Sequence, residues 1–182
     1  MPDTDLAEGY LRTAELLANS DDEEPSQTAI RKSISCSYYA IFHGLARTLA
    51  NSLIGEPVKG RSNRAWVEIY RGLDHGSCKT ACKKVVKINF PPAVKDFAHQ
   101  FVQMQDNRKR ADYDPLFRPT RWDALTLIAL VRLALEALDG VEDYDKKAFA
   151  TFVLITTPGA KHSRETHKDG SKRDIILVER PA

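Results

Sequence analysis

The segment SQTAIRKSISCSYYAIFHGLARTLANSL, residues 26–53, carries a long helical pattern. Its apolar residues recur at spacings of three and four along the whole segment: Ile30, Ile34, Tyr38, Ile41, Leu45 and Leu49. Residues at these spacings share one face of an α-helix. Ser26 comes just before the pattern and is a favoured N-cap residue. The segment therefore predicts a central helix that buries this face in the core.

Further helices are predicted on both sides of this segment. Apolar periodicity indicates helices over about residues 4–19, 62–73, 76–86, 92–113 and 121–139. Pro92 suits the first turn of its helix, and Thr120 with Asp123 resembles a capping box at the start of the last one. Gly140 ends that helix. The fold class predicted for residues 1–140 is therefore all-α.

Residues 141–182 differ in character and form a basic C-terminal extension. Phe149–Ile155 and Asp174–Glu179 are rich in β-branched and aromatic residues, which favours two short strands. Pro158-Gly159 and Asp169-Gly170 between them are turn formers. The extension is therefore predicted as a β-hairpin, with a disordered tail as the alternative.

Length and composition exclude several classes of protein. A chain of 182 residues with 42% hydrophobic and 29% charged residues fits one globular domain with an appendage. No apolar run approaches the roughly 20 residues that a membrane span needs. The acidic N-terminus lacks the features of a secretory signal, and three irregularly spaced cysteines fit a reducing compartment. We therefore expect a cytoplasmic protein without membrane contact.

The net charge of +2 hides a strong segregation of charge. Residues 1–25 contain one arginine against eight acidic residues, and residues 59–95 contain nine basic residues against two acidic ones. Clustered lysine and arginine are typical of phosphate binding, although a solvated helix face gives the same pattern. The middle of the chain is therefore a candidate nucleic-acid surface that includes Lys79, Lys83 and Lys84.

Two motifs carry a resemblance to a known family. The first is SYYAIFHGLARTL, residues 37–49, and the second is NRKRADYD, residues 107–114. In this order they resemble the HEPN family, small helical proteins often encoded beside minimal nucleotidyltransferases, in toxin–antitoxin pairs and in defence systems. The resemblance covers about residues 4–139. It implies an up-and-down bundle of four or five helices that usually forms a homodimer with a basic cleft at the interface.

The family's ribonuclease motif is incomplete in this chain. Active members carry an arginine and a histidine separated by four to six other residues, and two such motifs face each other across the dimer to cleave RNA without metal. Counting from Arg108, those positions hold Tyr113, Asp114 and Pro115, and counting from Arg110 they also lack histidine. Tyrosine, with a pKa near 10, is a poor general base at neutral pH. Whether the chain is an enzyme is therefore left open.

The candidate site residues follow from these motifs. Arg108, Arg110 and the three lysines named above are expected to bind phosphate, and Tyr39 is expected to line the cleft. If the protein is catalytic, the candidates are Arg108, Tyr113, Asp112 and His43. The structural alternatives are an Arg108–Asp112 pair at spacing four and a semi-buried, hydrogen-bonded His43.

Three functions remain open at this stage. The first is an RNA- or nucleotide-associated module of a toxin–antitoxin or defence system, and the second is a divergent metal-independent endoribonuclease toxin. The third is a protein-interaction subunit of a nucleotidyltransferase pair. His75, Cys78 and Cys82 resemble half of a zinc site but lack a convincing fourth ligand, so neither a metal nor another cofactor is expected.

Overall fold

The computed structural model describes residues 5–20, 25–56 and 61–155, which form seven helices and no strand. The helices are α1 (Leu6–Ala18), α2 (Gln27–Ile54), α3 (Asn63–Arg71), α4 (His75–Val85), α5 (Pro92–Tyr113), α6 (Arg121–Asp139) and α7 (Asp143–Leu154). The predicted all-α class is thus confirmed for this part of the chain. None of these helices is both long and apolar enough to cross a membrane.

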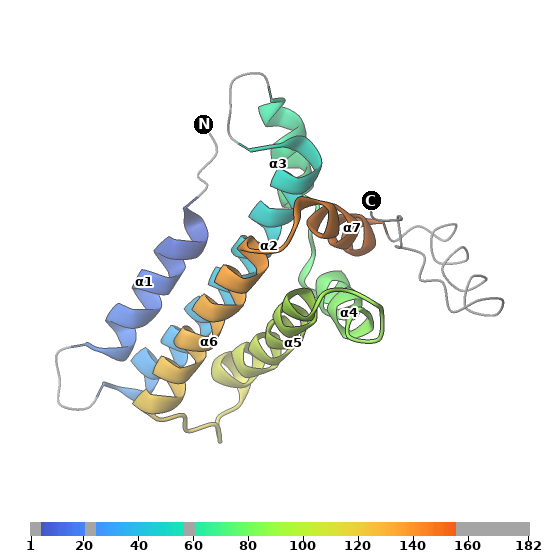
Figure 1. The fold of residues 1–182 in the computed structure, drawn as a ribbon. Helices are drawn as coiled ribbons and strands as arrows, with labels where there is room; N and C mark the ends of the chain where they lie inside the picture. The colour runs from blue at the N-terminus through green and yellow to red at the C-terminus, as the bar shows by residue number, and fades with distance from the viewer. Residues whose placement is uncertain (1–4, 21–24, 57–60, 156–182) are drawn as a thin grey trace.

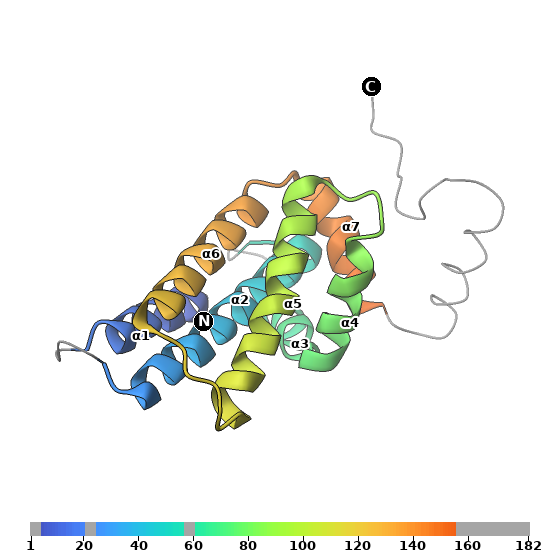
Figure 2. The ribbon, with the colours of Figure 1, turned by 90° about the horizontal axis from the view of Figure 1, so that it is seen from below.

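Four longer helices form the body of the fold. Helices α1, α2, α5 and α6 lie side by side and alternate in chain direction (Figure 1). The shorter helices α3 and α7 lie near the C-terminal end of α2, and α4 packs against α5 and α7 (Figure 2). Helix α2 contacts each of α1, α3, α5, α6 and α7. It is therefore the central element around which the others are arranged.

The predicted face of α2 is buried as expected. All six residues of its stripe are at most 4% exposed. Ser26 accepts a hydrogen bond from the Ala29 backbone N–H and so caps the helix. Gly44 lies so close to α6 that a Cβ atom there would be 2.2 Å from Leu135 Cδ2, and only glycine allows this approach without movement of Leu135.

The strand predicted over Phe149–Ile155 is wrong. These residues belong almost entirely to α7, which buries Phe149, Ala150, Phe152 and Val153. Their spacing puts them on one helical face, where Phe149 meets Phe90 and Phe97 edge to face. Burial on the existing core thus outweighs strand propensity. The second strand predicted, Asp174–Glu179, lies outside the described residues.

Arg31 of α2 joins this helix to the end of α5. Its Nε donates to the Ala111 carbonyl oxygen at 2.6 Å, and its Nη2 donates to that of Asp114 at 2.7 Å. Nη1 reaches the Phe117 carbonyl oxygen at 3.3 Å. The last carbonyls of a helix lack partners within the helix and carry partial negative charge. Arg31 therefore satisfies the α5 terminus and orders the turn after it.

We expect Arg31→Met to lower the free energy of unfolding by about 2–3 kcal/mol. The charged donor of these hydrogen bonds is lost, and the carbonyl groups at the end of α5 are left without their hydrogen-bond partner. Arg31→Lys should fall between wild type and Met, since an ammonium cannot reproduce the planar fork. Urea denaturation followed by circular dichroism measures both changes.

The matched control is Arg12→Met. The Arg12 side chain is 62% exposed and makes one ion pair with Glu8 within the same helix. Its removal should cost less than about 0.5 kcal/mol. Equal losses in the two methionine variants would contradict the role given to Arg31.

Candidate functional site

Arg108 is the centre of the candidate site. It projects from α5 toward α2, where its Nη2 donates to the Tyr39 hydroxyl at 3.1 Å. Its guanidinium carbon lies 5.7 Å from the ring centroids of both Tyr39 and Tyr113. The cation is therefore held between two aromatic rings, and its side chain keeps 22% of its surface exposed.

Asp112 fixes Arg108 from the other side. Its Oδ2 lies 2.7 Å from Arg108 Nε, as the spacing of four predicted, although the N–H is not aligned for a hydrogen bond. Ser35 of α2 donates to Asp112 Oδ1 at 2.5 Å, and Lys32 lies 3.9 Å from the same oxygen. Burial lowers the Arg108 pKa, but Tyr39 and Asp112 outweigh it and raise the pKa overall. The arginine is thus a permanent, positioned cation.

A stack of rings continues from Tyr39 to His43. Tyr10 of α1 stacks on Tyr39 at 5.5 Å and on His43 at 5.2 Å between ring centroids. His43 Nδ1 is 2.7 Å from the Tyr70 hydroxyl of α3. The expected semi-buried, hydrogen-bonded histidine is confirmed. Burial, and then the neighbouring His75, lower the His43 pKa, which favours the neutral ring.

His75 also belongs to the cluster of rings beside Arg108, and its place there was not predicted from the sequence. It begins α4, and its Nδ1 is 2.6 Å from the hydroxyl of Tyr38. Its ring centroid lies 4.2 Å from that of Phe42. Burial, and then the charge of Arg108, lower the His75 pKa. Asp74 precedes His75 in the sequence and caps α4, so a favoured N-cap residue at this position could have predicted that His75 begins a helix.

The structure does not bring the predicted basic residues onto one surface around Arg108. Arg110 is two positions further along α5 and instead lies 4.3 Å above the Phe117 ring. Residues two apart on a helix point in different directions. Lys79 forms an ion pair with Asp106, while Lys83 and Lys84 are exposed in the last turn of α4. Arg108 is thus grouped with aromatic rings and histidines, away from Arg110.

Cys78 and Cys82 are buried on α4 and are not arranged as metal ligands with other groups. Across residues 5–20, 25–56 and 61–155, no cluster of three or more histidine, cysteine or acidic side chains could hold a metal ion. Burial raises the pKa of the Cys78 thiol to about 12, so this group stays protonated at neutral pH.

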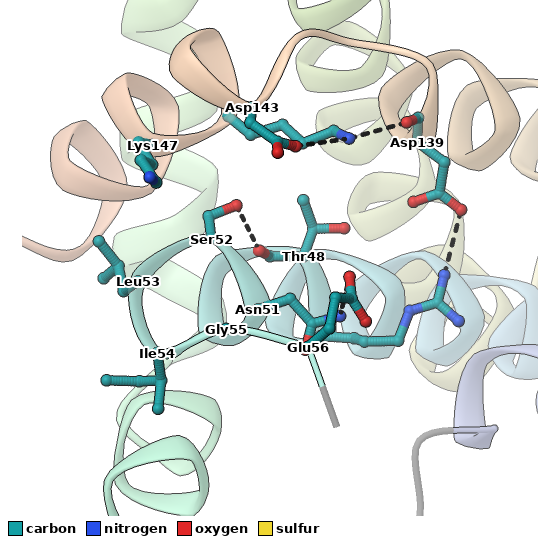
Figure 3. Close-up of a pocket in the computed structure, with 12 residues that line it drawn as sticks. Thr48, Asn51, Ser52, Leu53, Ile54, Gly55, Glu56, Asp139, Asp143 and Lys147 are labelled. Carbon is teal, nitrogen blue, oxygen red and sulfur yellow. Dashed lines mark hydrogen bonds and ion pairs between the residues drawn. The ribbon is translucent and has the colours of Figure 1, made fainter. Parts of the chain in front are cut away.

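A separate pocket lies at the C-terminal end of α2, beside the turn between α6 and α7 (Figure 3). It has a volume of about 750 Å³, and Thr48 and Ser52 lie on the α2 side. Two of its three cations are paired, because Arg47 reaches Asp139 at 3.2 Å and Lys146 reaches Asp143 at 3.7 Å; Lys147 is the third. No residue predicted for the site lines this pocket.

Comparison of the chain with known protein families, curated proteins and solved structures finds no match.

The two histidines should make stability depend on pH. Their pKa values are lowered in the folded state, so the unfolded chain binds more protons as the pH falls below about 6.5. Stability that is present at pH 7.5 should therefore decrease as the pH falls below about 6.5. Urea denaturation at a series of pH values measures this decrease.

We expect His43→Gln and His75→Gln each to flatten this decrease. His99→Gln, at an exposed position of α5, controls for the loss of an imidazole elsewhere on the bundle. A wild-type slope retained in both cluster variants would contradict the assignment of the pH dependence to these two rings.

Proposed function

We propose that the protein is an RNA-binding module of a toxin–antitoxin or defence system, as the HEPN resemblance suggests. The observation that carries this proposal is the position of Arg108 between two tyrosine rings, one of which is open to solvent. Tyr113 is 72% exposed at the end of α5. An arginine beside an exposed aromatic ring offers one phosphate contact and one base-stacking contact.

Single-stranded RNA fits this arrangement better than a duplex. Stacking on Tyr113 requires a base that is not already stacked and paired within a helix. The described contacts of Arg108 use Nε and Nη2, so we assign the N–H groups of Nη1 to a phosphate oxygen. Because these contacts are largely electrostatic, binding should weaken with salt.

Fluorescence anisotropy with a labelled 12-nucleotide single-stranded RNA tests the proposal. Arg108→Gln should raise the Kd about tenfold, because a charge-assisted contact is lost, while Ser35 and Lys32 still hold Asp112. Tyr113→Ala should raise it by a factor of about 5 or more through the loss of stacking.

Arg12→Gln is the control, because Arg12 is also a helical arginine with an acidic partner four residues away. It should bind like wild type. Binding that is insensitive to salt and to both site variants would contradict the proposal. Failure of the wild-type chain to retain RNA would favour the protein-interaction subunit of a nucleotidyltransferase pair, which stays a prediction, as does the homodimer.

A second candidate function, metal-independent cleavage of RNA, is favoured by the two histidines near Arg108. Each uses Nδ1 toward a tyrosine hydroxyl, which fixes the ring and leaves Nε2 as the second proton-transfer atom. One neutral imidazole would take the proton of the ribose 2′-hydroxyl as its oxygen attacks phosphorus. The other, protonated, would give a proton to the departing 5′-oxygen. The products are a 2′,3′-cyclic phosphate and a 5′-hydroxyl.

Incubation of labelled RNA with the protein in EDTA separates the two candidates. If cleavage occurs, His43→Gln and His75→Gln should each reduce its rate by about 100-fold or more while RNA binding is kept. The control His99→Gln should cleave like wild type. Binding without cleavage between pH 5.5 and 8 would reject the second candidate and leave the first intact.

A further inference from the structure

The pocket at the C-terminal end of α2 contains a buried hydroxyl without a partner among the described residues. Thr48 is 6% exposed, and its side chain projects from α2 toward the turn between α6 and α7 (Figure 3). Its Oγ1 makes no hydrogen bond with the described part of the chain, whereas Ser52, one turn later, donates to the Thr48 carbonyl oxygen at 2.7 Å. A buried polar group normally has a partner. The pocket therefore offers the Thr48 hydroxyl to a ligand.

Two lysines of α7 supply positive charge to the opposite wall of the pocket. Lys146 Nζ donates to the Asp139 carbonyl oxygen at 2.8 Å and lies 3.7 Å from Asp143, and its side chain is 18% exposed. An ammonium group has three N–H donors, so at least one of them is left for a ligand. Lys147 lines the pocket and forms no ion pair within the ranges that the structure describes. The α7 wall is therefore suited to an anionic group.

A positioned carboxylate lies on the α2 side of the pocket. The buried Trp66 donates its indole N–H to Asn51 Oδ1 at 2.8 Å, and Asn51 Nδ2 donates to Glu56 Oε1 at 3.0 Å. Gly55 has a φ of 102°, which glycine adopts easily, and the turn there brings Glu56 back to Asn51. Helix α2 also ends at this wall with the negative end of its dipole. The α2 wall is therefore suited to a cationic group.

The charges of the pocket balance, which decides the class of ligand. Three cations and three acidic residues line it, and the two ion pairs described above use all but two of them. The two are Lys147, on the α7 side, and Glu56, on the α2 side (Figure 3). A ligand with one net charge leaves one of these two walls unmatched. A ligand that carries both a cation and an anion matches both walls.

We propose that this pocket binds a free α-amino acid with an apolar side chain, in its zwitterionic form. The carboxylate of the ligand accepts hydrogen bonds from Lys147 and Thr48 Oγ1, and its ammonium group donates to Glu56. Leu53 and Ile54 form an apolar part of the lining and contact the side chain of the ligand. A charge-assisted hydrogen bond at each end fixes the orientation of a small ligand. The proposal does not involve the candidate RNA site, so each can fail without the other.

Titration of the full chain with L-leucine, followed by ¹H–¹⁵N NMR, tests the class of ligand. Millimolar L-leucine should shift the backbone amide signals of residues that line the pocket, with those of Thr48 and Lys147 among them. L-Leucinamide lacks the carboxylate and N-acetyl-L-leucine lacks the ammonium group, so each should bind more weakly by about tenfold or more, because one charge-assisted contact is lost. Absence of shifts at the pocket with L-leucine, or an analogue that binds as tightly as L-leucine, would overturn the proposal.

Two matched pairs of variants test the residues assigned to the carboxylate. Thr48→Val keeps the shape of the side chain and should raise the Kd for L-leucine about fivefold, because one hydrogen bond is lost. Lys147→Gln, at an exposed position, should raise it about tenfold, because the cation is lost. The controls are Thr13→Val, exposed on α1, and Lys109→Gln, exposed on α5, and both should bind like wild type. Unchanged binding in both pocket variants would overturn the assignment even if L-leucine binds.

Discussion

The contact of Arg31 with the end of α5 fixes the register between the two helices that form the candidate site. Arg31 donates hydrogen bonds to the carbonyl oxygens of Ala111 and Asp114, and one turn further along α2 Ser35 donates to the carboxylate of Asp112. One helix thus holds the backbone and the side chain of the same α5 turn. Arg108 lies just before this turn, so its direction follows from where α5 is anchored. A slip of α5 along α2 would separate Arg108 from Tyr39.

Much of this arrangement could be predicted from the sequence, because it depends on local spacing. The buried stripe of α2, the Thr120 capping box and the Arg108–Asp112 pair all follow from neighbours three or four residues apart. The two motifs, at residues 37–49 and 107–114, are also adjacent in space. Tyr39 from the first touches Arg108 from the second.

What could not be predicted depends on contacts between distant segments. Helix α7 has strand-forming residues, and only a core that already contains Phe90 and Phe97 makes the helix the better way to bury them. His75 joins the cluster because α4 begins beside Tyr38, 37 residues earlier in the chain. Arg110 was predicted to bind phosphate together with Arg108 because both are arginines of the same motif. Two residues further along the helix, however, its side chain points in another direction and lies over Phe117.

One of the two tryptophans of the chain is buried and the other is exposed, so intrinsic tryptophan fluorescence reports on two different regions of the protein. Trp66 is 1% exposed and donates its indole N–H to Asn51 at 2.8 Å, whereas Trp122 is 77% exposed at the start of α6. Emission from the first senses whether α3 remains docked on α2. Emission from the second, which water-borne quenchers such as iodide can reach, senses the exposure of the start of α6 to solvent. Unlabelled protein therefore carries separate fluorescent signals for its interior and for its outer face.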